Sequence, residues 1–112
     1  KIGDNIEEVA EGALTNCDNL KYIVFGKNVK VINDGLLGGS KIEQIEFNDG
    51  LEKLGSNVSG VGLKSKIDVS IPESVTEMTF RGAKTLIVKS GSYAESYAKE
   101  YADKLGMAYK VE

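Results

Sequence analysis

The chain has 112 residues, of which 41% are hydrophobic and 28% charged, with a formal net charge of -3. These values are typical of one small soluble globular domain, and the mixed charges form no basic stripe of the kind that binds nucleic acid. The sequence contains no histidine, which excludes Ser-His-Asp and Cys-His nucleophiles and histidine-ligated metal sites. No apolar run approaches the length of a membrane-spanning helix, so we expect no membrane insertion.

The first elements that the sequence predicts belong to an internal repeat of 22 to 24 residues. One pattern is an apolar-x-x-apolar step, found at Ile6/Val9, Val29/Ile32, Leu51/Leu54 and Val75/Met78. An apolar-x-x-apolar-x-apolar pattern alternates with it in constant phase, at Leu20/Ile23/Phe25, Ile42/Ile45/Phe47 and Ala83/Leu86/Val88, with a degraded copy at Lys66/Val69/Ile71. A fixed period of this length is the sequence signature of a solenoid.

Each repeat contains a short stretch with the alternation of a half-buried strand, as at 22–25 and 44–47. Strands that lie a whole repeat apart cannot pair through tight hairpins, so we expect successive coils to stack in parallel ladders. Corners are expected after three of the strands, at Gly26-Lys27-Asn28, Asn48-Asp49-Gly50 and Pro72-Glu73-Ser74.

These units resemble the BspA-like leucine-rich repeats, known also as the Treponema pallidum type. The resemblance lies in the spacing of Val29, Ile32, Leu36, Leu37 and Ser40 and in the segment Cys17-Asp18-Asn19-Leu20-Lys21-Tyr22-Ile23. It covers residues 2 to 88 as three to four units. The third unit departs from the family pattern at 56–63, and the fourth is shortened between Met78 and Ala83.

The C-terminal segment breaks the repeat. Apolar residues fall at helical spacing over 92–105, where Ser92 and Glu95 form a capping box. Gly106 suits the left-handed residue that follows a helix. We therefore predict a helix over 92–105 and a last strand over 107–111, which together cap the solenoid.

Several short motifs resemble ligand sites but lack a required feature. One glycine pattern resembles a P-loop but lacks the lysine that follows the second glycine. Two Asn-Asp-Gly turns lack the acidic spacing of an EF-hand calcium site. Two carboxylate pairs could serve as acid and base in glycoside cleavage, but they are expected at the solvated surface. These motifs are Gly55-x4-Gly60-Val61, Asn33-Asp34-Gly35, Asn48-Asp49-Gly50, Glu7/Glu8 and Glu43/Glu46. We predict no catalytic residue, no cofactor and no metal.

Three further features have two interpretations each. Cys17 is expected to pack rather than react, because no histidine can activate it. The tyrosine row of Tyr93, Tyr97 and Tyr101 is expected to bury the helix against the last coil, the alternative being a platform that stacks against sugars. Asn57-Val58-Ser59 matches a glycosylation sequon, which matters only in a compartment that modifies it.

The most informative prediction concerns the outward side of the strands. If Ile23, Phe25, Ile45 and Phe47 point inward, their neighbours form two outward columns on four strands. We call these eight residues the strand face, and they are Tyr22, Gln44, Asp68 and Thr85 in one column and Val24, Glu46, Ser70 and Ile87 in the other. Repeat proteins bind partners through flat mixed surfaces of this kind, and the alternative is a plain solvated sheet.

The sequence therefore predicts a mainly β fold with a C-terminal helix, in a right-handed leucine-rich-repeat solenoid of short parallel strands. We expect one domain, with a repeat array of about four units over 1–90 and the cap over 91–112. The resemblance implies a non-enzymatic adhesion or protein-binding domain of a bacterial surface or secreted protein, whose partner is a host or bacterial surface protein. A structural spacer and a carbohydrate-binding module that takes a glycan are the alternatives. The first coil has no predicted cap, so a monomer or a weak dimer through that coil is expected.

Overall fold

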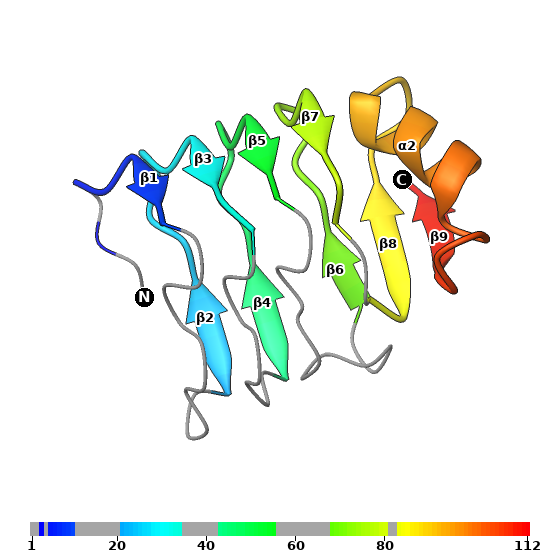
Figure 1. Ribbon diagram of the computed structural model, residues 1–112, viewed down its shortest axis with the longest axis horizontal. Coiled ribbons are helices and arrows are strands. Elements are labelled where there is room, and N and C mark those ends of the chain that lie inside the picture. Colours follow the sequence, from blue (N-terminus) through cyan, green and yellow to red (C-terminus); the bar gives the residue numbers. More distant parts are fainter. Residues whose placement is uncertain (1–2, 4, 11–20, 35–42, 56–67, 81–82) are drawn as a thin grey trace.

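The computed structural model describes residues 3, 5–10, 21–34, 43–55, 68–80 and 83–112. The chain winds as a solenoid of about three turns, and a helix and a closing strand lie at its C-terminal end (Figure 1). The elements are β1 (Glu8–Val9), β2 (Tyr22–Val24), β3 (Val31–Ile32), β4 (Gln44–Glu46), β5 (Lys53–Leu54), β6 (Asp68–Ser70), β7 (Glu77–Met78), β8 (Thr85–Val88), α2 (Tyr93–Tyr101) and β9 (Ala108–Val111).

The strands form parallel ladders on two sides of the solenoid. One side is a four-stranded sheet in the order β1-β3-β5-β7, and the other side holds the ladders β2-β4 and β6-β8-β9. Each ladder pairs residues of the same repeat position, as in the register of Ile32 with Leu54 and of Ile23 with Ile45. The repeat length equals one coil, so equivalent residues stack on one another. The predicted parallel solenoid is confirmed.

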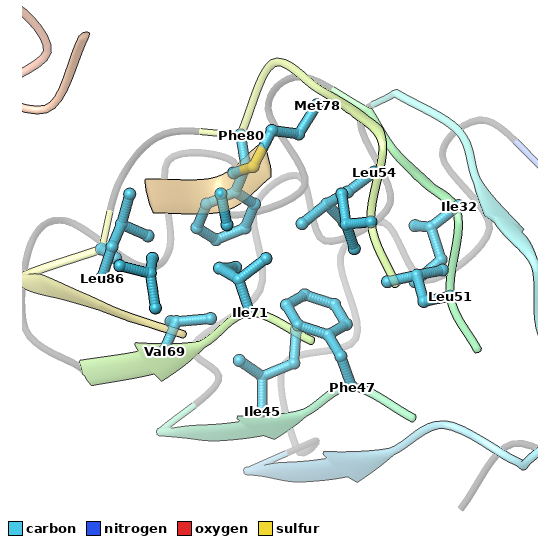
Figure 2. Close-up of a cluster of buried hydrophobic side chains, with 14 of the residues drawn as sticks. Ile32, Ile45, Phe47, Leu51, Leu54, Val69, Ile71, Met78, Phe80 and Leu86 are labelled. Carbon is cyan, nitrogen blue, oxygen red and sulfur yellow. The ribbon is translucent and has the colours of Figure 1, made fainter. Parts of the chain in front are cut away.

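The core lies between the two sides and consists of columns of equivalent apolar residues. Side chains from the four-stranded sheet and from β4 and β6 point toward each other (Figure 2). The ring of Phe25 stacks on that of Phe47 at a centroid distance of 5.5 Å, and Phe80 meets Phe47 edge-on at 6.1 Å. Burial of these columns stabilises each coil only when its neighbours are present, because a single coil cannot cover its own apolar side.

The predicted corners are present as turns after β2, β4 and β6. At the second corner Gly50 has a φ of 94°, a conformation that L side chains rarely adopt. Its N–H donates to Ser74 Oγ at 3.0 Å, and Ser74 Oγ donates to the carbonyl of Leu51 at 2.6 Å. A serine in one coil therefore ties two successive corners together.

The cap contains the predicted helix, but the helix is shorter than predicted. Ser92 Oγ accepts the N–H of Glu95 at 3.1 Å, as the predicted capping box requires. Glu95 Oε1 accepts the N–H of Gly91 at 2.9 Å, one residue before the N-cap N–H that a capping box would use. The helix ends at Tyr101 rather than at position 105. The backbone then turns and leads into β9 through Gly106, whose φ is 77°.

The last strand is present and pairs in parallel with β8. All four residues of β9 are exposed, so they do not show the alternating burial of the inner strands. No helix in the described ranges combines the length and the hydropathy needed to cross a bilayer.

Candidate interaction surface

Strand alternation fixes which side chains of the second side point outward. The centres of β2, β4 and β6 and position 86 of β8 are buried, while their flanking residues face away from the core. Five residues of the strand face are exposed and three are partly buried. The exposed ones are Tyr22, Gln44, Glu46, Asp68 and Ser70, and the partly buried ones are Val24, Thr85 and Ile87.

The ladder registers confirm the alignment of the predicted columns within two pairs of strands, β2 with β4 and β6 with β8. Tyr22 lies opposite Gln44 and Val24 opposite Glu46, as Asp68 lies opposite Thr85 and Ser70 opposite Ile87. Between these pairs, β4 and β6 are neighbours but belong to separate ladders. The segment of the third unit that departs from the family pattern lies between β5 and β6, outside the described residues.

The closing strand extends the strand face by one row that the sequence analysis missed. Ala108 lies opposite Thr85 and Lys110 opposite Ile87, so both side chains share the outward side. The alternating pattern of the last strand predicts that Ala108 and Lys110 share one side. The register of β9 with β8 could not be predicted, because β9 is not part of the repeat.

One hydrogen bond crosses the strand face diagonally. The Tyr22 hydroxyl donates to Glu46 Oε2 at 3.1 Å, although Tyr22 is 47% exposed. Desolvation, the hydrogen bond to the Glu46 carboxylate and the negative charge of that carboxylate raise the pKa of Tyr22 above its ordinary value. An aromatic ring on a mixed polar and apolar face is a feature of protein-binding surfaces.

A small hollow of about 170 Å³ lies at the carboxyl ends of β4, β6 and β8. Two of its lining residues, Ser70 and Ile87, also belong to the strand face.

The four-stranded sheet presents a different surface, in which charges are paired from coil to coil. Lys53 Nζ lies 3.5 Å from Glu77 Oε2, and Asn33 Nδ2 donates to Glu8 Oε2 at 2.8 Å. These four side chains also line a hollow of about 520 Å³, so its polar groups already bind one another. Exposed pairs of this kind contribute little to stability but leave few groups for a ligand.

The tyrosine row is only partly buried, so the packing prediction is correct for one ring of three. Tyr97 is 7% exposed and its hydroxyl donates to the carbonyl of Phe80 at 2.7 Å. Tyr93 and Tyr101 are 41% and 40% exposed. Residues four apart on a helix drift by about 40° around its axis, so the outer two rings turn away from the coil that the central ring contacts.

The remaining candidates give no site within the described residues. Glu7, Glu8, Glu43 and Glu46 are all exposed, and the described ranges hold no group of three histidine, cysteine or acidic residues able to bind a metal ion. Other candidates lie, wholly or in part, outside the described ranges; they are Cys17, the sequon at 57–59 and the glycine motifs that include Gly35 and Gly60.

Stacked parallel coils with an apolar residue at every fixed step define the chain as a leucine-rich-repeat solenoid. Comparison with protein families gives the same class: the family described as BspA type leucine rich repeat region (6 copies) matches residues 1–83. The chain belongs to this family. Neither a search of curated proteins nor a search of solved structures returned a match. Repeats of this kind generally mediate protein interactions, are typically non-enzymatic and typically occur in surface proteins.

Proposed function

We propose that this chain is a non-enzymatic adhesion domain of a bacterial surface or secreted protein, and that it binds another protein through the strand face. The observation that carries the proposal is the exposed Tyr22 ring, which the hydrogen bond to Glu46 holds in place among polar neighbours. A preorganised ring loses little conformational entropy when a partner covers it.

The backbone beneath the strand face supports the same proposal. Ile23 and Ile45 are 2% and 6% exposed and anchor β2 and β4 in the core, directly beside the outward residues. The outward side chains therefore project from a rigid ladder. Rigid elements position binding groups more closely than loops do.

A carbohydrate-binding module is the second candidate, and it would use the cap. Tyr93, Tyr101 and Tyr109 are each about 40% exposed there. The rings of Tyr97 and Tyr101 are 5.1 Å apart but tilted by 43°, so these two do not form a flat platform for a sugar. A structural spacer, the third candidate, requires no ligand for either surface.

Binding of the immobilised chain at physiological salt to a panel of extracellular-matrix proteins and of bacterial and host glycans tests the proposal. The Tyr22→Ala/Gln44→Ala double variant removes the larger side chains of the strand face. The matched control is Lys30→Ala/Glu52→Ala, which removes an exposed ion pair between the residues that precede β3 and β5 on the other side of the solenoid. We expect saturable binding of a protein that the first variant weakens at least tenfold and the control leaves unchanged.

Glycan binding that Tyr101→Ala abolishes would replace the proposal with the carbohydrate module. A folded, monomeric chain that binds nothing in the panel would favour the spacer.

A further inference from the structure

The hollow beside the strand face is built from three successive coils at one repeat position, together with the end of the closing strand β9. Its residues follow β4, β6, β8 and β9 or lie at their ends, and they are Phe47, Asp49, Ser70, Ile71, Pro72, Ile87, Val88, Lys89 and Glu112. We call it the anchor pocket. Ser70 and Ile87 connect it to the strand face, so a molecule lying on that face meets the pocket at its edge.

The anchor pocket lies where the backbone ladder is interrupted. The N–H of Phe25 donates to the carbonyl of Glu46 at 3.1 Å, and the N–H of Ile71 donates to that of Ile87 at 2.9 Å. Among the described residues, the equivalent bond from Phe47 to Ser70 is missing. No backbone ladder therefore joins β4 to β6 at this point. Phe47 and Ser70 both line the pocket.

The size and floor of the anchor pocket suit one apolar side chain. Its volume of about 170 Å³ is well below that of sites for small molecules or cofactors, which measure roughly 300 to 1,000 Å³. An enclosed cavity of about 150 Å³ can admit a benzene ring, and this hollow has a similar volume but is open to solvent on one side. Phe47, Ile71 and Val88 are 8%, 2% and 1% exposed and form the apolar base of the pocket, while Asp49, Ser70, Lys89 and Glu112 contribute polar groups around it.

The charge around the anchor pocket favours a cation next to that side chain. Lys89 Nζ lies 3.9 Å from Glu112 Oε1, so the lysine on the rim is already compensated. Asp49 is exposed on the opposite rim and makes no ion pair within the described part of the chain. On the adjoining strands, Glu46 and Asp68 add two exposed carboxylates, of which Glu46 accepts the Tyr22 hydroxyl, and Lys110 adds one exposed cation opposite Ile87. Carboxylates therefore outnumber cations around the pocket. A basic group of the partner would meet these carboxylates.

We propose that the anchor pocket receives one aromatic side chain of a protein partner, next to an arginine or lysine that pairs with Asp49. The inference rests on the proposed function, since it names the chemistry of the partner at the same face. Anchors of this type, one large side chain in a pocket with a charge beside it, dominate the affinity of many protein interfaces.

Three blocked dipeptides serve as probes in titrations of the isotope-labelled chain followed by backbone amide chemical shifts. They are acetyl-Phe-Arg-amide, acetyl-Phe-Glu-amide and acetyl-Gly-Arg-amide. We expect the first to shift the amides of Ser70, Ile87 and Asp49 saturably, and the other two to bind at least fivefold more weakly. Equal binding of the first two peptides, or shifts that fall elsewhere, would overturn the inference.

Two variants locate the contacts. Ser70→Tyr fills the pocket from an exposed strand position and should weaken the Phe-Arg peptide at least fivefold. Asp49→Asn removes the rim charge and should weaken it two- to fivefold. Asp103→Asn, an exposed residue of the cap, is the matched control and should have no effect, and circular dichroism checks that each variant is folded.

The same variants separate this inference from the proposed function. A panel protein that needs Tyr22 but binds Ser70→Tyr with full affinity contradicts the anchor pocket and leaves the adhesion proposal intact. If no panel protein binds but the Phe-Arg peptide binds specifically at the pocket, the adhesion proposal is contradicted and the anchor-pocket inference is supported.

Discussion

The hydroxyl of Tyr22 on β2 donates to the carboxylate of Glu46 on β4 across 3.1 Å, although the register partner of Tyr22 is Gln44. This diagonal contact joins two successive coils on their outer side. The interior joins the same coils through Phe25 and Phe47. The Phe25–Phe47 contact joins equivalent repeat positions, whereas the Tyr22–Glu46 contact joins non-equivalent ones, and both depend on the parallel register of β2 and β4.

The Tyr22–Glu46 contact predicts a pH dependence. The pKa of Tyr22 is raised, so the folded chain holds the phenol proton more tightly than the unfolded chain does. The stabilisation is complete below the ordinary pKa of 10.0 and is lost as the pH rises through the higher folded value. Glu46→Gln should lower the pKa of Tyr22, measured by NMR titration of its ring carbons. Glu77→Gln, on the opposite sheet, should leave it unchanged. A Tyr22 pKa that is the same in all three proteins would contradict the contact.

A close backbone approach at Gly55 predicts that this glycine is required. A Cβ at position 55 would lie 2.7 Å from the backbone nitrogen of Asp34 and 2.8 Å from the carbonyl carbon of Asn33. Gly55→Ala should therefore cost about 1 to 3 kcal/mol of unfolding free energy, measured in urea. Gly3→Ala is the control, because its Cβ would meet nothing within 4 Å. Equal stability of the two variants would show that the coils are not packed this closely.

The buried hydroxyl of Tyr97 predicts a difference between two tyrosines of one helix. Tyr97→Phe leaves the carbonyl of Phe80 without that donor in a buried position and should cost about 1 to 3 kcal/mol. Tyr93→Phe changes an exposed ring and should alter stability by less than about 0.5 kcal/mol. Thermal unfolding of both variants checks the prediction. A Tyr97→Phe protein as stable as the Tyr93→Phe protein would mean that the cap does not dock through this bond.

Equivalent repeat positions should differ in energy according to their place along the solenoid. Leu51 is fully buried between two coils, whereas Ile6, at the same step of the first coil, is 41% exposed. Leu51→Ala should cost about 2 to 5 kcal/mol because it opens a cavity. Ile6→Ala should cost less than about 1 kcal/mol. Urea unfolding that gives equal losses for both would contradict the stacking order.

The coils could be predicted from the sequence, because the same apolar pattern occurs in several successive repeat units. Ile23 and Ile45 occur at the same phase of their units, and the inward side follows from strand alternation alone. The capping role of Ser92 was also readable, since a cap depends on residues only three positions apart.

Features that depend on contacts between elements could not be predicted in this way. The missing bond between Phe47 and Ser70 depends on how two coils meet, and no local pattern encodes it. The exposure of Tyr93 and Tyr101 depends on which side of α2 packs against the last coil, and the helical spacing alone does not determine that side. The anchor pocket combines residues of three coils and of the closing strand, so no single segment of the sequence predicts it.

The central claim is that neighbouring residues of one strand have opposite roles, with Gln44 in the binding surface and Ile45 in the core. The most direct measurement compares the Gln44→Ala and Ile45→Ala variants. For each variant it determines the unfolding free energy and the affinity for the panel protein that the unmodified chain binds. We predict that Gln44→Ala weakens binding with a change in stability below about 0.5 kcal/mol. Ile45→Ala should cost about 2 to 5 kcal/mol, while its folded fraction still binds. A stability loss below about 0.5 kcal/mol for Ile45→Ala, or unchanged binding by Gln44→Ala, would contradict the account.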